Sequence, residues 1–346
     1  PSYPQWKPKT KLDDKLLILT DEDSDGRADQ VRVFAGGLHQ PTGFELGHGG
    51  AYVAQQQDIL FLKDTDGDDR ADVKRLVYAG FGSEDMHHAL NSFRWGPGGY
   101  LYFNQGIYIH SHVETPYGQR VLHKGGVWQF RPQTLELEVY DNSITGTNTW
   151  GHVFDRWGQS MVTTSWPDGI YHIWPETPLA NQRKRIVADR KLVRVGDARH
   201  CGGDFIGGKF LPKGWDGNLL TCQFKTQRVQ RFSVDESEAG YVIRETESLV
   251  TSTFPKFRPV DVKQGPDGAI YVADWYNEII NHAEVDFRDK RRDHSHGRIW
   301  RITRTSAEHG QPPRLDQQAT EQLLEHLKSR LPVVRHLAKQ TLADRE

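Results

Sequence analysis

An all-β fold, a six-bladed β-propeller followed by a short helical tail, is predicted by three features of this 346-residue sequence. A hairpin with a tight turn recurs along the chain. Its copies are spaced roughly 50–60 residues apart, as expected for four-stranded propeller blades with their loops. The 10 Trp, 12 Tyr and 15 Phe residues supply large side chains that can fill the space between such blades.

The clearest hairpin lies in residues 257–276, which read FRPVDVKQGPDGAIYVADWY. Gly265-Pro266-Asp267-Gly268 is a tight-turn signal, because Pro presets φ and Gly accepts a positive φ. Alternating apolar and polar residues precede the turn, and a β-branched and aromatic run follows it, which is typical of two paired strands. The other copies lie at 49–53, 94–102, 156–162 and 215–220. These five copies, with an incomplete blade before the first, predict six blades.

The predicted propeller occupies residues 1–307, with its first blade incomplete at the N-terminus, and residues 312–346 form a helical region. Leu323, Leu327 and Leu331 follow helical spacing, and Pro332 suits the first position of a second helix. Such a helix pair is typical of the start of a HEAT-like array. The sequence begins without Met and without a signal-peptide pattern, so we expect a processed or truncated start.

Composition excludes several classes of function. The net charge is −2 and there is no basic stripe, which argues against nucleic-acid binding. No apolar run approaches the length of a membrane span. Two cysteines, Cys201 and Cys222, leave open both a disulfide and two buried thiols. The chain has no Cys-x-x-Cys-His motif, so we expect it to carry no c-type haem.

Two loops between predicted strands repeat one acidic pattern, DEDSDGRAD at 21–29 and DTDGDDRAD at 64–72. Carboxylates at positions 1, 3, 5 and 9 of a tight loop bring several oxygens to one hard cation. Arg32 and Arg75 stand where an EF-hand has its Glu, so we expect calcium-binding hairpins with a structural role. The alternative is a solvated turn without an ion. The predicted ligands are Asp21, Asp23, Asp25, Asp29, Asp64, Asp66, Asp68 and Asp72.

Imidazole, amide and cationic side chains stand in segments that enter the predicted innermost strands of different blades. These residues are His87, His88, Asn148, His200, Lys225 and Arg258. In a propeller they would meet at one end of the central channel, where they can bind an anionic ligand and supply a base near neutral pH. Each residue alone has a structural alternative, such as capping a turn or pairing with a nearby carboxylate.

Several segments carry a resemblance to a known family over about residues 16–304. They are the two acidic loops, 87–97, HCGG at 200–203, 257–276, and RDKRRDHSHGRIWRI at 288–302. The sequence resembles a membrane-bound dehydrogenase domain of planctomycetes and verrucomicrobia, which is similar in turn to quinoprotein sugar dehydrogenases. The resemblance implies a calcium-dependent enzyme that oxidises a sugar or polyol with pyrroloquinoline quinone (PQQ). It also implies a periplasmic or extracytoplasmic location and a cytochrome c as electron acceptor.

The resemblance also implies a catalytic base and a calcium site. In quinoproteins the catalytic His lies nine residues before the Pro of the following hairpin, which selects His88, whereas His87 fits the nearer family better. That His would take the hydroxyl proton of the substrate. Trp166 and Pro167 match a pair whose backbone carbonyls bind a catalytic Ca²⁺, which would polarise a quinone oxygen.

The implied cofactor contacts are incomplete. Asn148, Lys225 and Arg258 match residues that contact PQQ, a tricarboxylate that needs cations to hold it. Val260 stands where a second arginine would grip the cofactor. The remaining candidate cofactor-binding residues are His200 and Trp275.

Two other functions stay open at the level of sequence. One is a lyase or hydrolase acting on carbohydrate with a divalent metal, because three histidines and an open position make a working site. Its candidate ligands are His87, His88, His152, His200 and His282. The other is a non-catalytic propeller that binds a glycan or a protein partner. A bound redox cofactor, a bound transition metal, or neither would separate the three.

Overall fold

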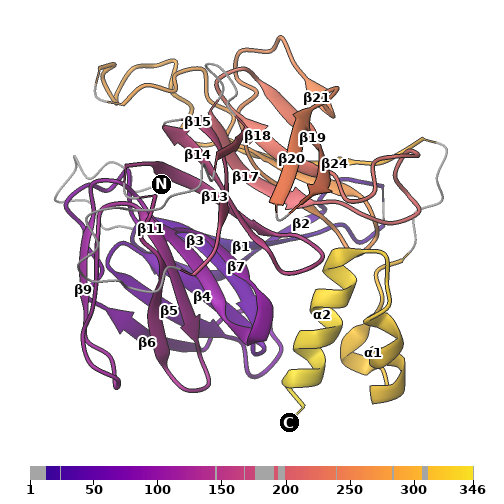
Figure 1. Ribbon diagram of the computed structural model, residues 1–346, viewed down its shortest axis with the longest axis horizontal. Helices are drawn as coiled ribbons and strands as arrows, with labels where there is room; N and C mark the ends of the chain where they lie inside the picture. Colours follow the sequence, from indigo (N-terminus) through magenta and orange to yellow (C-terminus); the bar gives the residue numbers. More distant parts are fainter. Residues whose placement is uncertain are drawn as a thin grey trace. The chain divides into compact units, whose positions relative to one another are not determined.

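The computed structural model describes residues 13–345, except 24, 145, 167, 176–190, 194–198, 239, 283 and 306–310. The chain divides into two compact units, Pro1–Asn148 and Thr149–Glu346, which we call unit 1 and unit 2. Figure 1 shows the strands and helices of both units along the chain. Each unit is built from antiparallel sheets of consecutive strands, so the fold is that of a β-propeller.

Unit 1 contains two four-stranded sheets. The first has the order β3 (Pro41–Gly47), β4 (Gly50–Gln55), β5 (Asp58–Lys63) and β6 (Val73–Ala79). The second has the order β7 (Asn91–Trp95), β8 (Leu101–Gln105), β11 (Gly126–Arg131) and β12 (Glu136–Asp141), with a 3₁₀ turn, η1 (Pro97–Gly99), between β7 and β8. Two further pairs are β1 (Asp14–Thr20) with β2 (Gln30–Leu38), and β9 (His110–Val113) with β10 (Arg120–His123).

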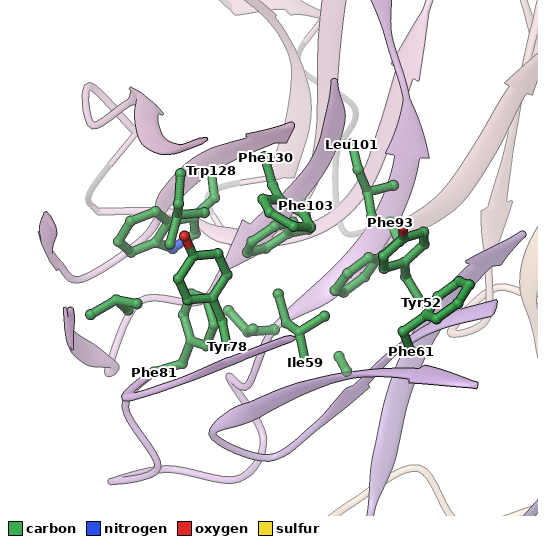
Figure 2. Packing of buried hydrophobic residues seen from close by; sticks show 14 of the residues in the cluster. Tyr52, Ile59, Phe61, Tyr78, Phe81, Phe93, Leu101, Phe103, Trp128 and Phe130 are labelled. Carbon is green, nitrogen blue, oxygen red and sulfur yellow. The ribbon is translucent and has the colours of Figure 1, made fainter. Parts of the chain in front are cut away.

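The core of unit 1 is aromatic, as Figure 2 shows. The Phe93 and Phe103 rings stack with centroids 4.8 Å apart. Tyr52 and Tyr78 each form a T-shaped pair with Phe130, with ring centroids 6.2 Å and 5.4 Å apart. Edge-to-face and offset contacts of this kind add to the free energy gained from burying the rings. The aromatic residues that the sequence supplies therefore fill the space between the two four-stranded sheets.

Unit 2 contains three sheets and a helical tail. The first sheet is β13 (Asn148–Phe154), β14 (Ser160–Trp166), β15 (Asp168–Ile173) and β16 (Lys191–Val193). The second is β17 (His200–Phe205), β18 (Leu219–Gln223), β19 (Arg228–Ser237) and β20 (Gly240–Glu245), with β21 (Val250–Thr251) also paired to β19. The third is β22 (Pro259–Gln264), β23 (Ile270–Asp274) and β24 (Arg298–Ile302).

The tail of unit 2 is helical, as predicted. A 3₁₀ turn, η2 (Leu315–Gln317), precedes α1 (Thr320–His326) and α2 (Pro332–Ala343), which pack on each other through Leu323 and Ala338 (Figure 1). Arg330, between the helices, lies 3.2 Å from Asp216 in the β17–β18 connection. Neither of the described helices is long and apolar enough to cross a membrane.

All five predicted hairpin turns are confirmed. The segments at 49–53, 94–102, 156–162, 215–220 and 265–268 each lie at the connection between the first two strands of a sheet with three or more strands. Gly268 shows the constraint on such turns. Its φ is +84°, and a Cβ atom there would lie 2.2 Å from the Phe210 ring. Glycine is required at this position for both reasons.

The prediction of six blades is wrong. The described residues form five sheets of three or more strands, and the expected extra blade is only the β1–β2 ribbon. No third described strand pairs with this ribbon. Leu17, Leu19 and Val31 are exposed, and a two-stranded sheet of this kind buries little apolar area.

We expect Phe130→Ala to lower the free energy of unfolding by about 3–5 kcal/mol, because it leaves a cavity in the aromatic core. The matched control is Phe44→Ala on β3, where the Phe44 ring is 50 % exposed. That change should cost about 1 kcal/mol or less. Urea unfolding of the full chain, followed by Trp fluorescence, measures both. Equal losses would contradict this description of the core.

Candidate functional site

Two adjacent histidines share one carboxylate in the loop between β6 and β7, in unit 1. The Oδ1 atom of Asp85 accepts the backbone N–H of His87 at 2.9 Å and lies 2.8 Å from its Nδ1. The Oδ2 atom lies 3.1 Å from Nδ1 of His88. The His88 backbone N–H also donates to the Asp85 carbonyl at 3.0 Å, which closes a tight turn. Asp85 therefore hydrogen-bonds the His87 ring and lies at ion-pair distance from the His88 ring, whose Nδ1 makes no well-directed hydrogen bond within the described part of the chain.

His88 has the properties of a base at neutral pH. Its side chain is 11 % exposed, compared with 29 % for His87. Burial lowers the pKa of His88 below its usual value of 6.5, although the neighbouring charge of Asp85 opposes the shift. Burial alone would raise the pKa of Asp85, but hydrogen bonds from His87 and the two imidazoles lower it overall. A neutral His88 beside an ionised Asp85 is the arrangement that accepts a proton and stabilises the resulting imidazolium.

Gly106 and Tyr108, which follow β8, also contact His88. The Gly106 backbone N–H donates to the His88 carbonyl at 2.9 Å. A Cβ atom on Gly106 would lie 2.6 Å from the Cβ of His88, so any larger residue would displace it. The Tyr108 ring meets the His88 ring edge-on, with centroids 4.9 Å apart. Sequence reasoning missed Asp85, Gly106 and Tyr108. Only Asp85, three residues before His88, left a local signal.

In unit 2, the guanidinium of Arg258 holds four backbone carbonyls. Its Nε donates to Asn277 at 2.9 Å, its Nη1 to Phe224 at 2.9 Å and Lys225 at 3.5 Å, and its Nη2 to Glu278 at 3.1 Å. Burial lowers the pKa of Arg258 from its usual value. The side chain thus ties the β18–β19 turn to the segment after β23, and most of its donors are used in this contact.

The structure brings Lys225, Arg258 and Trp275 together through these backbone contacts. The Trp275 N–H donates to the Arg258 carbonyl at 2.9 Å, and the indole side chain is 41 % exposed. Asn148 is the first residue of β13 and is half-buried. His200 is fully buried on β17, with its Nδ1 2.9 Å from the hydroxyl of Thr221 on β18. His200 is therefore held within its own sheet.

Two of the three histidines proposed as metal ligands in unit 2 have partners in their own sheets, whereas His282 lies in the connection between β23 and β24. His152 is buried on β13, and its Nε2 lies 2.7 Å from the hydroxyl of Ser160 on β14. His200 has the equivalent contact with Thr221. Among the described residues, trios of His, Cys, Asp or Glu whose ligand atoms all lie within 4.8 Å of one another occur only in the two acidic loops.

Three of the four predicted aspartates in each acidic loop bring their carboxylate oxygens together. Ligand oxygens of Asp21, Asp23 and Asp25 lie within 4.8 Å of one another, as do those of Asp64, Asp66 and Asp68. Each loop also turns at a glycine with positive φ, +88° at Gly26 and +82° at Gly67. The charge of Asp68 raises the pKa of Asp66 above its usual value, because the carboxylates are crowded. Crowded carboxylate oxygens fit a hard cation.

The last predicted aspartate of each loop has a different contact. Asp29 accepts the backbone N–H of Glu22 at 2.7 Å, and Asp72 accepts that of Thr65 at 3.1 Å. The second loop is also linked to β2, because Arg32 on that strand forms an ion pair with Asp69. Of the predicted catalytic calcium pair, Pro167 lies outside the described residues. Trp166 is the last residue of β14, and its side chain also lies outside the described part.

Comparison with solved structures agrees with the propeller fold. One glucose dehydrogenase is 13 % identical and aligns with a TM-score of 0.57 over 84 % of this chain and 91 % of that one. A second glucose dehydrogenase is 12 % identical, with a TM-score of 0.50 over 84 % and 90 % of the two chains. An aldose sugar dehydrogenase from Escherichia coli in its apo form is 18 % identical, with a TM-score of 0.46 over 67 % and 73 %. At these identities the likeness to the two glucose dehydrogenases shows the fold alone.

Family assignment rests on the sequence itself. No curated protein matches the chain. The profile of one family, described as a domain of unknown function (DUF7133), matches residues 1–306. This match covers every sheet described above and ends before the helical tail. The chain therefore belongs to the DUF7133 family.

Proposed function

We propose that this protein is a dehydrogenase that oxidises a hydroxyl group of a sugar or polyol, with His88 as the base. The observation that carries the proposal is the half-buried Asp85–His88 pair, whose Oδ2 and Nδ1 atoms lie 3.1 Å apart. A propeller fold shared with glucose dehydrogenases supports the same class of reaction by analogy.

The chemistry assigned to His88 is proton removal. With Nδ1 3.1 Å from Oδ2 of Asp85, Nε2 is the nitrogen assigned to take the proton from the substrate hydroxyl. The charge of Asp85 stabilises the imidazolium that forms, and Gly106 keeps the backbone of His88 in place. The substrate carbon loses a hydride in the same reaction, and a two-electron acceptor of the quinone class receives it.

The activity should be lost only on the acid side, at a pH below 6.5, because the folded protein lowers the pKa of His88. Asp85→Asn removes the charge that raises this pKa, so the acid limb should move to still lower pH while the maximal rate falls. His88→Ala should reduce kcat by about a hundredfold or more. A sugar screen with an artificial electron acceptor, followed by pH–rate profiles, measures these effects.

His326→Ala, on α1, is the matched histidine control and should leave the rate unchanged. If His88→Ala turns over the substrate with an unchanged kcat, His88 is not the base. A shift of the acid limb to higher pH in Asp85→Asn would show that a different group controls it.

The residues fit PQQ only in part. The Lys225 ammonium is a cation that could meet a carboxylate of the cofactor. Arg258, however, already donates to four backbone carbonyls, and Val260 stands in the place of the second arginine. A bidentate grip on a carboxylate needs a guanidinium with two free parallel donors. The arginine clamp is therefore a poor fit, and the proposed proton transfer does not depend on it.

Titration of the full chain with PQQ and Ca²⁺, followed by absorbance, tests the cofactor directly. If PQQ is the acceptor, we expect saturable binding at about one per chain that Lys225→Ala weakens at least about tenfold. Lys256→Ala, a lysine in the loop between β21 and β22, is the matched control. If PQQ does not bind but dye-linked sugar oxidation is retained, the electron acceptor is not PQQ. The role of His88 as the base would still stand.

We also propose that the two acidic loops bind structural Ca²⁺. A ligand that binds only the folded state stabilises it, by about 2.7 kcal/mol at a concentration one hundred times the Kd. We therefore expect Ca²⁺ to raise the Tm and a chelator to lower it. Asp23→Asn and Asp66→Asn should each remove part of the increase, since each change removes a charged ligand from one loop.

The control for the calcium experiment is Glu114→Gln, an exposed carboxylate after β9. It should leave the effect of Ca²⁺ on Tm unchanged. A Tm that does not respond to Ca²⁺ in the unmodified protein would show that the loops are solvated turns without an ion.

Three further assignments rest on the family resemblance of the sequence. We propose that electrons pass to a cytochrome c, that the protein acts in the periplasm or another extracytoplasmic space, and that α1 and α2 correspond to the start of a HEAT-like array. Reduction of an added cytochrome c during sugar oxidation would support the first.

A further inference from the structure

Three histidines lie on one exposed face of the β9–β10 hairpin in unit 1. His110 and His112 are two residues apart on β9, so their side chains point to the same face. His123 on β10 is the direct cross-strand partner of His110. Burial alternates accordingly, because these three residues are exposed whereas Ser111, Val113 and Leu122 are buried on the opposite face.

The imidazole nitrogens of two of these residues already converge. Nδ1 of His110 lies 2.8 Å from Nδ1 of His123. Two neutral rings reach this distance only by sharing a proton, with one nitrogen donating and the other accepting. A cation bound to both offers a second solution, because two nitrogens about 2.0–2.1 Å from one tetrahedral zinc lie roughly 3.3 Å apart.

The third ring stands beside this pair. The centroids of His112 and His123 are 5.1 Å apart with an interplanar angle of 81°, and those of His110 and His123 are 5.0 Å apart. As placed, His112 does not bring a nitrogen within 4.8 Å of both other ligand atoms. Metal binding would require the His112 ring to rotate about its two side-chain bonds, and its exposed position on the same face leaves room for that rotation.

The backbone that carries the trio is held by a buried polar network. The fully buried amide of Gln105 donates to the carbonyls of Ile109, Leu122 and Lys124 at 2.9–3.2 Å. Two of these carbonyls belong to the residues directly before His110 and His123. The Gln105 carbonyl oxygen in turn accepts the Ser111 hydroxyl at 2.6 Å. Ligands on a backbone fixed in this way lose little entropy when they bind an ion.

We propose that His110, His112 and His123 form a binding site for a divalent transition metal ion such as Zn²⁺, Cu²⁺ or Ni²⁺. Imidazole suits these ions, whereas the hard Ca²⁺ prefers oxygen ligands, so this site is chemically distinct from the acidic loops. Three imidazoles leave a fourth position on a tetrahedral ion for water or another ligand. The bound ion would also clamp β9 to β10 across the exposed face.

The test uses the full, untagged chain, stripped of transition metals and titrated with Zn²⁺ against a chromophoric chelator. We expect one Zn²⁺ per chain, with affinity reduced at least about tenfold in both His112→Ala and His123→Ala, since even the loss of a group supporting a ligand costs that much. His326→Ala controls for the loss of an unrelated histidine. Unfolding midpoints without metal should match in all variants, because the rings are exposed.

Cu²⁺ electron paramagnetic resonance supplies a second readout that does not depend on affinity. The nitrogen hyperfine pattern should report three bound imidazoles in the unmodified protein and two in His112→Ala. Absence of stoichiometric binding would overturn the proposal. A pattern that His112→Ala leaves unchanged would overturn it as well, because the site would then consist of His110 and His123 alone.

Discussion

The pairing of the first two strands in each sheet is the constraint on which the rest of the fold depends. The β22–β23 turn shows how it is fixed, because the Asp267 carboxylate accepts the Ala269 N–H and the Tyr271 hydroxyl, each at 3.0 Å. The same carboxylate pairs with Arg301 on β24 at 2.8 Å. A slip of one residue would turn the buried Val262 and Val272 to the opposite face. One turn residue thus sets the register of three strands.

Much of this architecture could be predicted from the sequence, since turn chemistry is local. The Gly-Pro-Asp-Gly signal and its weaker copies located all five sheet-opening hairpins. The number of blades could not be predicted in the same way. The β1 and β2 segments have the residue types of strands, but a strand counts toward a sheet only through its hydrogen-bonded neighbours. Those neighbours leave no mark on the sequence of the strand itself.

For the candidate site as well, some features could be predicted from the sequence and others depend on the structure. The family resemblance pointed to His88 through its distance from the following Pro and left His87 open, and the deeper burial of the His88 side chain is what favours it. The role of Arg258 was not visible, because its partners are main-chain carbonyls that any residue type provides. The contact with Gly106 is steric and depends on how two segments approach each other. Residue types therefore indicated which positions matter, whereas their roles depend on backbone placement.

The β9–β10 hairpin has a consequence for how this fold can vary. β8 and β11 pair directly, from Gly126 with Gln105 to Phe130 with Leu101, so the intervening 20 or so residues are an excursion that the sheet does not need. The hairpin could be exchanged during evolution without breaking these strand pairs, provided that its replacement fills the part of the core now occupied by Val113 and Leu122. Gln105 is a further constraint, because its buried amide would otherwise lose three carbonyl partners. We infer that residue 105 and the hairpin change together among relatives, as a unit inherited or replaced in one step.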